Sequence, residues 1–409
     1  MSTLNTSAIR AQFPALRREE NGTTVAWFDG PGGSQVPHGV IDAIGAFLRR
    51  GGSNHGGAFA ASRDSEATHE EARDAIADLY GARDSDYVAF GMNMTSLNFA
   101  LSRAISANWT PGDEVVVTRL DHDANVSPWL RAAADKGATV KWVPFDTATY
   151  RLDLDRLADV VNARTKLVAI THASNAIGTI VDIATATRVA HDAGALVVVD
   201  AVHYAPHGLI DIAATDCDFL LASAYKFFGP HLGAMAGRSA LFEEFDAYKV
   251  RPSPARGPGK WETGTQSFEA LAGVTAAVEH IASLAPEEAT RRERIATAYA
   301  GIQDHALQLG QRFLDGLPNA VTVFGITDDL TMRTPTYAVE LEGMSARRLA
   351  TELGDRSIYV TDGDYYAVEV MKALDRADGG LVRIGFLHYT SEDEVDRLLE
   401  ALHELARNA

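Results

Sequence analysis

An acidic and a basic side chain follow two apolar runs in the middle of the sequence. The run 196–199 leads into Asp200, and the run 219–222 leads into Ser223 and Lys226. Short apolar runs bounded by glycine, proline and polar residues predict strands that are buried on both faces, and ligands collect at the carboxyl ends of such strands. A carboxylate and an amine placed there suit a ligand that has a cationic ring nitrogen and an aldehyde able to form a Schiff base. Pyridoxal phosphate has both groups, whereas the two residues taken alone also suit an ordinary ion pair at a strand end.

A candidate phosphate site lies earlier in the chain. An apolar run at 87–90 breaks at Gly91, and a helical pattern begins near Thr95. At such a junction the free N–H groups and the positive end of the helix dipole point at the same gap. Every strand-to-helix connection of an α/β fold shares this arrangement, so other residues have to decide whether this one binds an anion. Two glycine-rich turns at 30–33 and 51–57 suit either backbone close to a ligand or surface loops.

The order of the expected elements predicts an α/β fold with two units. Apolar, strand-like runs alternate with helical patterns up to about residue 270, and this alternation is typical of a mostly parallel sheet flanked by helices. A long helical stretch then leads into three expected strands and their flanking helices, which predict a smaller α+β unit. We expect an N-terminal segment at 1–25 that packs near the small domain, a large ligand-binding domain at 26–275, and a small C-terminal domain at 276–409 that includes the long connecting helix.

Composition argues against several classes of function. The 409 residues include 55 acidic and 37 basic side chains, a formal net charge of -18, whereas nucleic-acid binding requires a concentrated basic face. No apolar run approaches the roughly 20 residues of a membrane span, and the start lacks the basic end and apolar core of a secretory signal. The single cysteine, Cys217, can form neither an internal disulfide nor a cysteine-based metal cluster. We expect a cytoplasmic protein that binds neither nucleic acid nor membrane and holds no metal.

Motifs spread from about residue 28 to residue 402 resemble those of fold type I pyridoxal phosphate enzymes. The similarity is greatest to the class V aminotransferase group and, within it, to cysteine desulfurases of the SUF type. The matching motifs, in the family's order and at similar spacing, are FGMNMTSLN (90–98), LDHDANVSPW (120–129), SNAIGT (174–179), VDAVHYAPH (199–207), SAYKFFGP (223–230), WETGTQ (261–266) and VRIGFLHYTSEDEVDRL (382–398). The resemblance implies a mostly parallel, seven-stranded sheet flanked by helices, with the smaller α+β domain at the C-terminus.

The resemblance assigns roles to residues of the expected ligand site. Lys226 matches the lysine that forms the Schiff base and then removes the Cα proton of the substrate. Asp200 matches the acid that keeps the pyridine nitrogen protonated, and His122 matches the histidine that stacks on the cofactor ring and relays protons. Asn175 is expected near the phenolic oxygen of the cofactor, and His203 stands where the desulfurases carry glutamine.

Other matches concern the cofactor phosphate and the substrate. The backbone of Met94 and Thr95 and the hydroxyl of Ser223 are expected to hold the phosphate. Thr265 matches a phosphate ligand that the family supplies from the second subunit, so the resemblance implies a homodimer. Arg383 matches the arginine that binds the substrate α-carboxylate in bidentate fashion, and an ordinary surface arginine is the alternative.

Two departures from the family bear on the reaction and the cofactor. The loop VTDGDYYAVEVMKAL (360–374) has no cysteine where the desulfurases carry the one that accepts sulfur as a persulfide, and it contains Tyr365 and Tyr366. Cys217 cannot replace the missing residue, because it lies on the strand that leads to the lysine. Tyr225 takes the place of a histidine that contacts the cofactor phosphate.

We expect a pyridoxal phosphate enzyme that acts on a small α-amino acid. A desulfurase-like lyase that cleaves a C–S or another Cβ bond agrees best with these residues, because the cofactor residues are kept and the persulfide cysteine is missing. A class V aminotransferase is the main alternative and an amino-acid epimerase a weaker one, since all three reactions begin with removal of the Cα proton. A cofactor-holding protein without activity is disfavoured because Lys226, Asp200, His122 and Arg383 are all present.

Overall fold

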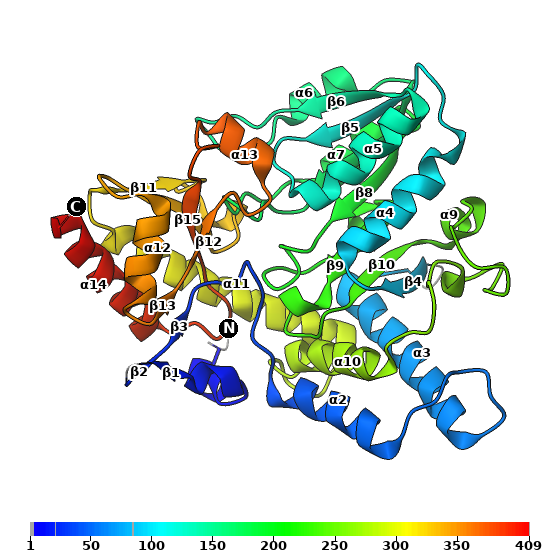
Figure 1. Cartoon of the computed structure of the whole chain (residues 1–409), viewed down its shortest axis with the longest axis horizontal. Helices are drawn as coiled ribbons and strands as arrows, with labels where there is room; N and C mark the ends of the chain where they lie inside the picture. The colour runs from blue at the N-terminus through cyan, green and yellow to red at the C-terminus, as the bar shows by residue number, and fades with distance from the viewer. Residues whose placement is uncertain (1–3, 21, 84–85, 409) are drawn as a thin grey trace.

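A seven-stranded sheet is the largest element of the computed structural model, which describes residues 4–20, 22–83 and 86–408; residues 1–3 and 21 of the expected N-terminal segment lie outside these ranges. The spatial order of the strands is β4-β10-β9-β8-β7-β5-β6 (Figure 1). They are β4 (Asp86–Gly91), β5 (Glu114–Thr118), β6 (Thr139–Val143), β7 (Thr165–Thr171), β8 (Leu196–Asp200), β9 (Phe219–Ser223) and β10 (Gly233–Arg238). The expected α/β fold with a seven-stranded sheet is confirmed.

All strands of this sheet run in one direction except β10. That strand is antiparallel to both of its neighbours, β4 and β9, because the turn after Lys226 returns the chain directly beside β9. The other pairs, β5 with β6 and β7, β7 with β8, and β8 with β9, are parallel. The carboxyl ends of all the strands but β10 therefore lie along the same edge of the sheet.

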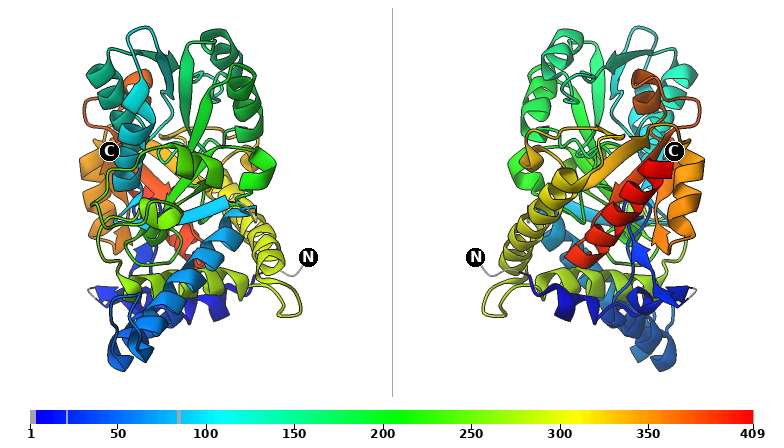
Figure 2. Two further views of the ribbon diagram at one scale, coloured as in Figure 1. Left: turned by 90° about the vertical axis from the view of Figure 1, so that its right-hand side faces the viewer. Right: turned by 90° about the vertical axis from the view of Figure 1, so that its left-hand side faces the viewer.

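Both faces of the sheet are buried, which explains why its strands are apolar without interruption. Val197 and Val199 of β8 pack into one hydrophobic cluster, and Val198 packs into a second cluster on the other face, as the two-residue period of a strand requires. Figure 2 shows helices on both sides of the sheet. The first face is covered by α3 (Ala60–Tyr80), α7 (Ile183–Asp192), α10 (Phe268–Ala282) and α11 (Arg291–Gly316), and the second by α4 (Met94–Ile105) and α5 (Ser127–Lys136).

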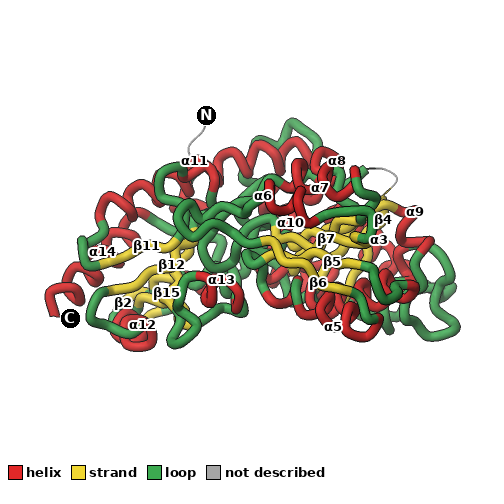
Figure 3. The backbone as a smooth tube through the Cα atoms, turned by 90° about the horizontal axis from the view of Figure 1, so that it is seen from above, coloured by secondary structure: helices red, strands yellow, loops and turns green. Residues whose placement is uncertain are grey.

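A four-stranded antiparallel sheet of order β11-β12-β15-β14 forms the smaller unit. Its elements are β11 (Val321–Phe324), β12 (Thr336–Leu341), β14 (Thr361–Gly363), β15 (Leu381–Gly385), α12 (Ala346–Gly354), α13 (Val368–Ala373) and α14 (Glu392–Asn408). The expectation of three strands was wrong by one: β11 escaped it because this edge strand has only four residues, most of them partly exposed. Helix α11 packs against α3 of the large unit and α14 of the small one, and it runs past both units in Figure 3.

The N-terminal part of the chain lies against the small unit. Helix α1 (Thr6–Arg10) ends in Arg10, whose guanidinium binds the carboxylate of Glu394 in α14 at 2.6 Å. Further along, β3 (Ala26–Trp27) pairs in parallel with β13 (Ile358–Tyr359). The chain therefore pairs with the small unit before it enters the large sheet.

The remaining elements are peripheral to the two sheets. They are β1 (Glu19–Glu20), β2 (Thr23–Thr24), α2 (His38–Arg50), α6 (Leu154–Val160), α8 (Ile212–Thr215) and α9 (Ser239–Glu244). Among the described residues, no helix has the length and apolar character needed to cross a membrane. The division of the chain at 1–25, 26–275 and 276–409 stays a prediction.

Gly233 opens β10 beside the start of α4. A Cβ atom at this position would lie 2.7 Å from the carbonyl oxygen of Asn93, the residue that caps α4. We expect Gly233→Ala to lower the free energy of unfolding by about 1–3 kcal/mol, because the backbone of the cap has to move. Urea unfolding measures this change, and Gly39→Ala in α2 is the matched control because nothing lies within 4 Å of its added Cβ. An equal response of the two variants would contradict the close contact at Gly233.

Candidate active site

A cavity of about 750 Å³ lies at the carboxyl edge of the large sheet, with walls from both units. Side chains at or just beyond the ends of β4, β5, β7, β8 and β9 reach it from the large unit, and β15 contributes from the small one. Ten of the eleven residues expected to bind the cofactor or the substrate line this cavity, and Thr265 is the exception. The ten are Met94, Thr95, His122, Asn175, Asp200, His203, Ser223, Tyr225, Lys226 and Arg383.

The amine of Lys226 is held by backbone carbonyls. It donates to the carbonyl oxygens of Pro31 and Gly32, to the latter at 3.0 Å. Within the described part of the chain, no carboxylate lies at ion-pair distance from it. Burial lowers the pKa of Lys226 to about 7, and the nearby Arg383 guanidinium acts in the same direction. The burial therefore favours the neutral amine near pH 7, the form that attacks an aldehyde or removes a proton.

Asp200 ends β8 inside the same cavity and is 5% exposed. Its carboxylate accepts a hydrogen bond from the Val202 N–H at 2.9 Å. Burial raises the pKa of Asp200 to about 6, while this hydrogen bond and the charge of Lys226 oppose the rise. The plain ion pair between Asp200 and Lys226, which the sequence left open, does not form, and both groups face the cavity.

The N-terminus of α4 closes one end of the cavity with hydrogen-bond donors. Asn93 caps the helix, and its side-chain oxygen accepts from the Ser96 N–H at 2.9 Å. The Met94 N–H donates to the Ser223 hydroxyl oxygen at 2.9 Å. The first N–H groups of a helix have no acceptor within the helix, and the helix dipole favours an anion there. Met94, Thr95 and Ser223 can therefore bind a phosphate together.

Two histidines line the cavity in their neutral form. The His122 Nδ1 accepts from the Ala124 N–H at 3.0 Å, and burial lowers the pKa of His122 to about 4. The neutral ring therefore carries its proton on Nε2. The His203 Nε2 lies 3.1 Å from the Thr334 hydroxyl, and burial holds the pKa of His203 well below its usual value. Near pH 7 neither ring adds positive charge to the cavity.

Arg383 enters the cavity from β15 and is 5% exposed. Its Nη1 donates to the backbone carbonyl of Asn175 at 3.1 Å, and its Nη2 lies 3.8 Å from the carboxylate of Asp29. The guanidinium carbon lies 4.5 Å from the centre of the Tyr365 ring. Its Nε is buried and has no hydrogen-bond partner among the described residues. The planar group is thus fixed in place with donor capacity left for a carboxylate.

Tyr365 and Tyr366 form a strained turn between β14 and α13. Their φ angles of 53° and 58° lie in the left-handed region, which costs a non-glycine residue about 1–2 kcal/mol. Contacts with the large unit hold the turn: the Asn175 amide donates to the Tyr365 carbonyl at 2.9 Å, and the Asp123 N–H donates to the Tyr366 carbonyl at 2.7 Å. The Tyr366 ring stacks on His122 with the ring centres 5.4 Å apart. This loop of the small unit is thereby fixed to the large unit at the cavity.

Thr265 lies on an exposed turn outside the cavity of its own chain. The neighbouring Glu262 anchors that turn to α3, because its buried carboxylate contacts the His69 ring nitrogen at 3.0 Å and the Arg73 guanidinium at 2.8 Å. Thr265 is therefore presented outward from a fixed base. Its expected role in a second subunit stays a prediction.

Cys217 lies just before β9, at the opposite end of that strand from Ser223. It is fully buried, and burial raises the pKa of its thiol to about 12. The hydroxyl of Thr215 is its polar neighbour, at 3.6 Å from the sulfur. A buried thiol with a raised pKa is not a nucleophile, and this one does not line the cavity.

The sequence did not decide which backbone segments would belong to the site. Of the two glycine-rich turns, 30–33 lines the cavity through Pro31 and Gly32, whereas 51–57 does not. His231 was missed altogether, although its ring stacks on Tyr225 at 4.9 Å with the planes 8° apart. Nothing in its sequence context marks it, because the contact depends on the fold of the turn that follows Lys226.

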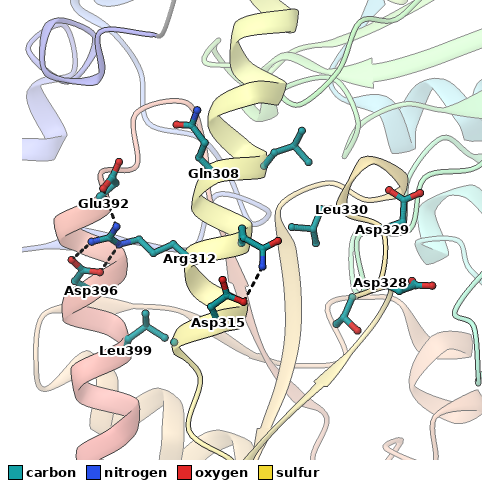
Figure 4. A pocket seen from close by; sticks show the side chains of 13 residues that line it. Gln308, Arg312, Asp315, Asp328, Asp329, Leu330, Glu392, Asp396 and Leu399 are labelled. Carbon is teal, nitrogen blue, oxygen red and sulfur yellow. Dashed lines mark hydrogen bonds and ion pairs between the residues drawn. The ribbon is translucent and has the colours of Figure 1, made fainter.

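A second hollow, of about 1000 Å³, lies between α11 and α14 (Figure 4). Arg312 crosses it and binds Glu392 at 3.0 Å and Asp396 at 2.6 Å. Acidic residues form much of its lining, and no lysine, histidine or cysteine belongs to it in the part of the chain that the structure describes. Its single cation is already paired, so the catalytic chemistry belongs to the cavity around Lys226.

Fold type I pyridoxal phosphate enzymes combine such a sheet with an amine and a carboxylate at its carboxyl edge, and the structure points to this class. Within it, the chain belongs to the aminotransferase class-V family, whose sequence profile matches residues 26–398. The protein is therefore a pyridoxal phosphate-dependent enzyme.

Individual relatives are consistent with this assignment. An uncharacterized protein of Mycobacterium tuberculosis is 34% identical over 92% of this chain and 94% of its own length. A probable cysteine desulfurase of Vibrio cholerae is 30% identical over 98% of both chains. The apo structure of the cysteine desulfurase from Thermococcus onnurineus has a TM-score of 0.89 at 25% identity and covers 100% of both chains. The resemblance to the cysteine desulfurases is confirmed.

The lowered pKa of Lys226 predicts how the apoenzyme captures its cofactor. Only the neutral amine reacts with the aldehyde, so the capture rate should rise with pH to about 7 and then level off. Stopped-flow absorbance of the cofactor between pH 6 and 10 measures this rate. A rate that keeps rising tenfold per pH unit up to pH 9 would mean that the amine has an ordinary pKa. Lys226→Ala is the control, and borohydride should trap no adduct on it.

Proposed function

We propose that this enzyme is a lyase that removes a Cβ substituent, bonded through sulfur or another atom, from a small α-amino acid. The placement of Cys217 is the observation that supports the proposal most strongly. The only cysteine of the chain is buried at the far end of β9, and the loop beside the cavity carries Tyr365 and Tyr366. No thiolate of this chain can accept sulfur at the cavity, so the sulfur departs with the leaving group.

The cavity fits pyridoxal phosphate. The start of α4 and Ser223 would hold the phosphate, Lys226 the aldehyde carbon, and Asp200 the ring nitrogen. The side-chain oxygen of Asn175 is buried and has no partner among the described residues, so a polar group of the cofactor can satisfy it. When bound, the cofactor supplies a cationic ring that takes up the electron pair left at Cα.

Lys226 is suited to move the Cα proton. Its pKa near 7 lets the amine exist in both protonation states at neutral pH, as a general base that later returns a proton requires. Arg383 binds the α-carboxylate and so fixes the amino acid at one end. Asp200 contributes a buried negative charge that favours the protonated ring nitrogen. His122, which is neutral at this pH, would stack on the cofactor ring without adding charge.

The overall reaction balances without a sulfur acceptor or an oxidant. The bond between Cβ and the leaving group breaks, and its electron pair goes with the leaving group. One water is consumed, and the three-carbon fragment leaves as pyruvate and ammonium. A class V aminotransferase would instead transfer the amino group to the cofactor and leave pyridoxamine phosphate.

Product analysis tests the proposal. We incubate the holoenzyme with β-chloroalanine, cysteine and alanine, and follow pyruvate, sulfide and pyridoxamine phosphate. We expect pyruvate from substrates with a Cβ leaving group, because they lose it once the Cα proton is removed. Alanine has no Cβ leaving group, so it should give at most one molecule of pyruvate per active site. β-Chloroalanine is the positive control for removal of the Cα proton, because it loses chloride after that step in either kind of enzyme. Stoichiometric pyridoxamine phosphate from alanine, with neither pyruvate nor sulfide from cysteine, would favour the aminotransferase and contradict the lyase.

We also propose that the enzyme is a homodimer in which Thr265 reaches the cofactor phosphate of the partner subunit. The support is the position of Thr265, exposed on an anchored turn outside its own cavity. Earlier in the same domain, the side chains of Tyr248 and Val250 are large, apolar and 67% and 64% exposed, as expected of a surface that another chain covers. The location and the domain roles are further parts of the proposal. The single buried cysteine agrees with a reducing cytoplasmic location.

We assign cofactor binding to the proposed 26–275 domain.

Mixed dimers test the position of Thr265. We combine Lys226→Ala subunits with Thr265→Val subunits by unfolding and refolding the mixture. If Thr265 acts in the partner, one site of each mixed dimer keeps both residues, and activity should return to about half of that of the wild type per mixed dimer. If Thr265 acts in its own chain, neither site is intact and the mixture stays as inactive as its parents. Sedimentation of each protein shows whether dimers form.

A further inference from the structure

Tyr365 and Tyr366 follow each other in one turn, but their rings lie in different environments. Tyr365 is buried, its hydroxyl donates to the Leu381 carbonyl, and its ring packs beneath the Arg383 guanidinium. Tyr366 is 69% exposed and lines the cavity beside His122. The first ring therefore positions the carboxylate-binding arginine, and the second is free to contact a ligand.

Two fixed points determine how an amino acid lies in this cavity. Its α-carboxylate binds Arg383 and its Cα lies at the Lys226 amine. The side chain then has to extend along the remaining wall, and among the lining residues the large accessible aromatic ring on the small unit is Tyr366. A hydrogen bond fixes the backbone of Tyr366 to the large unit, because the Asp123 N–H donates to the Tyr366 carbonyl at 2.7 Å.

The charges of the walls limit what that side chain can be. Apart from imidazoles, Lys226 and Arg383 are the only cationic side chains that line the cavity in the described part of the chain. Both are engaged by the backbone of the amino acid or by the cofactor, so neither is left to bind a side-chain carboxylate. His122 and His203 are neutral because burial lowers the pKa of each. The walls suit an uncharged side chain with an aromatic group.

We propose that Tyr366 determines specificity for cysteine S-conjugates that carry an aromatic group, by stacking on that group beside His122. The inference rests on the proposed lyase function and names its substrate class. An aromatic thiolate spreads its charge over the ring and leaves without a nearby acid, so the hydroxyl of Tyr366 is not required. For S-phenylcysteine, the Cβ–S bond breaks with its electron pair on sulfur, which takes up a proton. One water is consumed, and the products are thiophenol, pyruvate and ammonium.

The ratio of two kcat/KM values tests the proposal, because the fraction of active enzyme in a preparation cancels in this ratio. We measure pyruvate formation from S-phenylcysteine and from β-chloroalanine, which has no aromatic group. Tyr366→Ala should lower the ratio of the first kcat/KM to the second by about tenfold, near the upper end of what an aromatic pair contributes. The change should lie in the KM for S-phenylcysteine. Tyr366→Phe, which keeps the ring, should hold the ratio within about twofold of the wild type.

A binding measurement separates this inference from the proposed reaction. Calorimetry with the cofactor-loaded Lys226→Ala enzyme gives the Kd of S-phenylcysteine without turnover. Adding Tyr366→Ala should raise this Kd by about tenfold, whereas adding Tyr366→Phe should not. An unchanged Kd and an unchanged ratio would overturn the role of Tyr366 while the lyase stands. A raised Kd in an enzyme that yields only pyridoxamine phosphate would overturn the lyase and its conjugate substrates, and leave Tyr366 as the residue that recognises aromatic side chains.

Discussion

Desolvation of charged groups is the constraint on which this active site depends. One cavity holds an amine, a guanidinium and a carboxylate, and burial favours the neutral form of each of them. Hydrogen bonds to backbone groups reduce the free-energy cost of burying these charges. Carbonyls of the turn 30–33 accept from Lys226, the carbonyl of Asn175 accepts from Arg383, and a backbone N–H donates to Asp200. Because these groups are not consumed in ion pairs with one another, their charge remains available to a cofactor and a substrate.

The fold supplies those backbone groups from distant places. All strands but β10 end at one edge of the large sheet, so their last residues converge without any long loop. The small unit then closes the cavity with β15 and with the turn that carries Tyr365 and Tyr366. That turn adopts a left-handed backbone at two successive tyrosines. Contacts from Asn175 and Asp123 hold it there, which couples the closure of the cavity to the residues that line it.

Much of the fold and most of the site could be predicted from the sequence. The apolar runs that end at Asp200 and Ser223 form neighbouring strands of the large sheet as expected. The antiparallel edge strand β11 was missed because four partly exposed residues give no periodic signal. Asp200 and Lys226 were ambiguous, since an ion pair and a cofactor site use the same two residues. The family motifs identified the other candidate site residues. They gave no information on His231, because its ring meets Tyr225 only in the folded chain.

Residue types and their spacing were enough to predict a mostly parallel sheet, the helix that starts at Met94 and the lysine after the end of its strand, whereas the number of strands followed from the family motifs. These are local properties, because strand periodicity and helix N-termini depend on neighbours within a few positions. The contacts of the cavity were decided by tertiary packing. Tyr366 meets His122, and Lys226 meets the turn 30–33, across about half of the length of the chain. Such pairs have no spacing that a pattern could reveal, since only the tertiary packing of distant segments sets the distance between them.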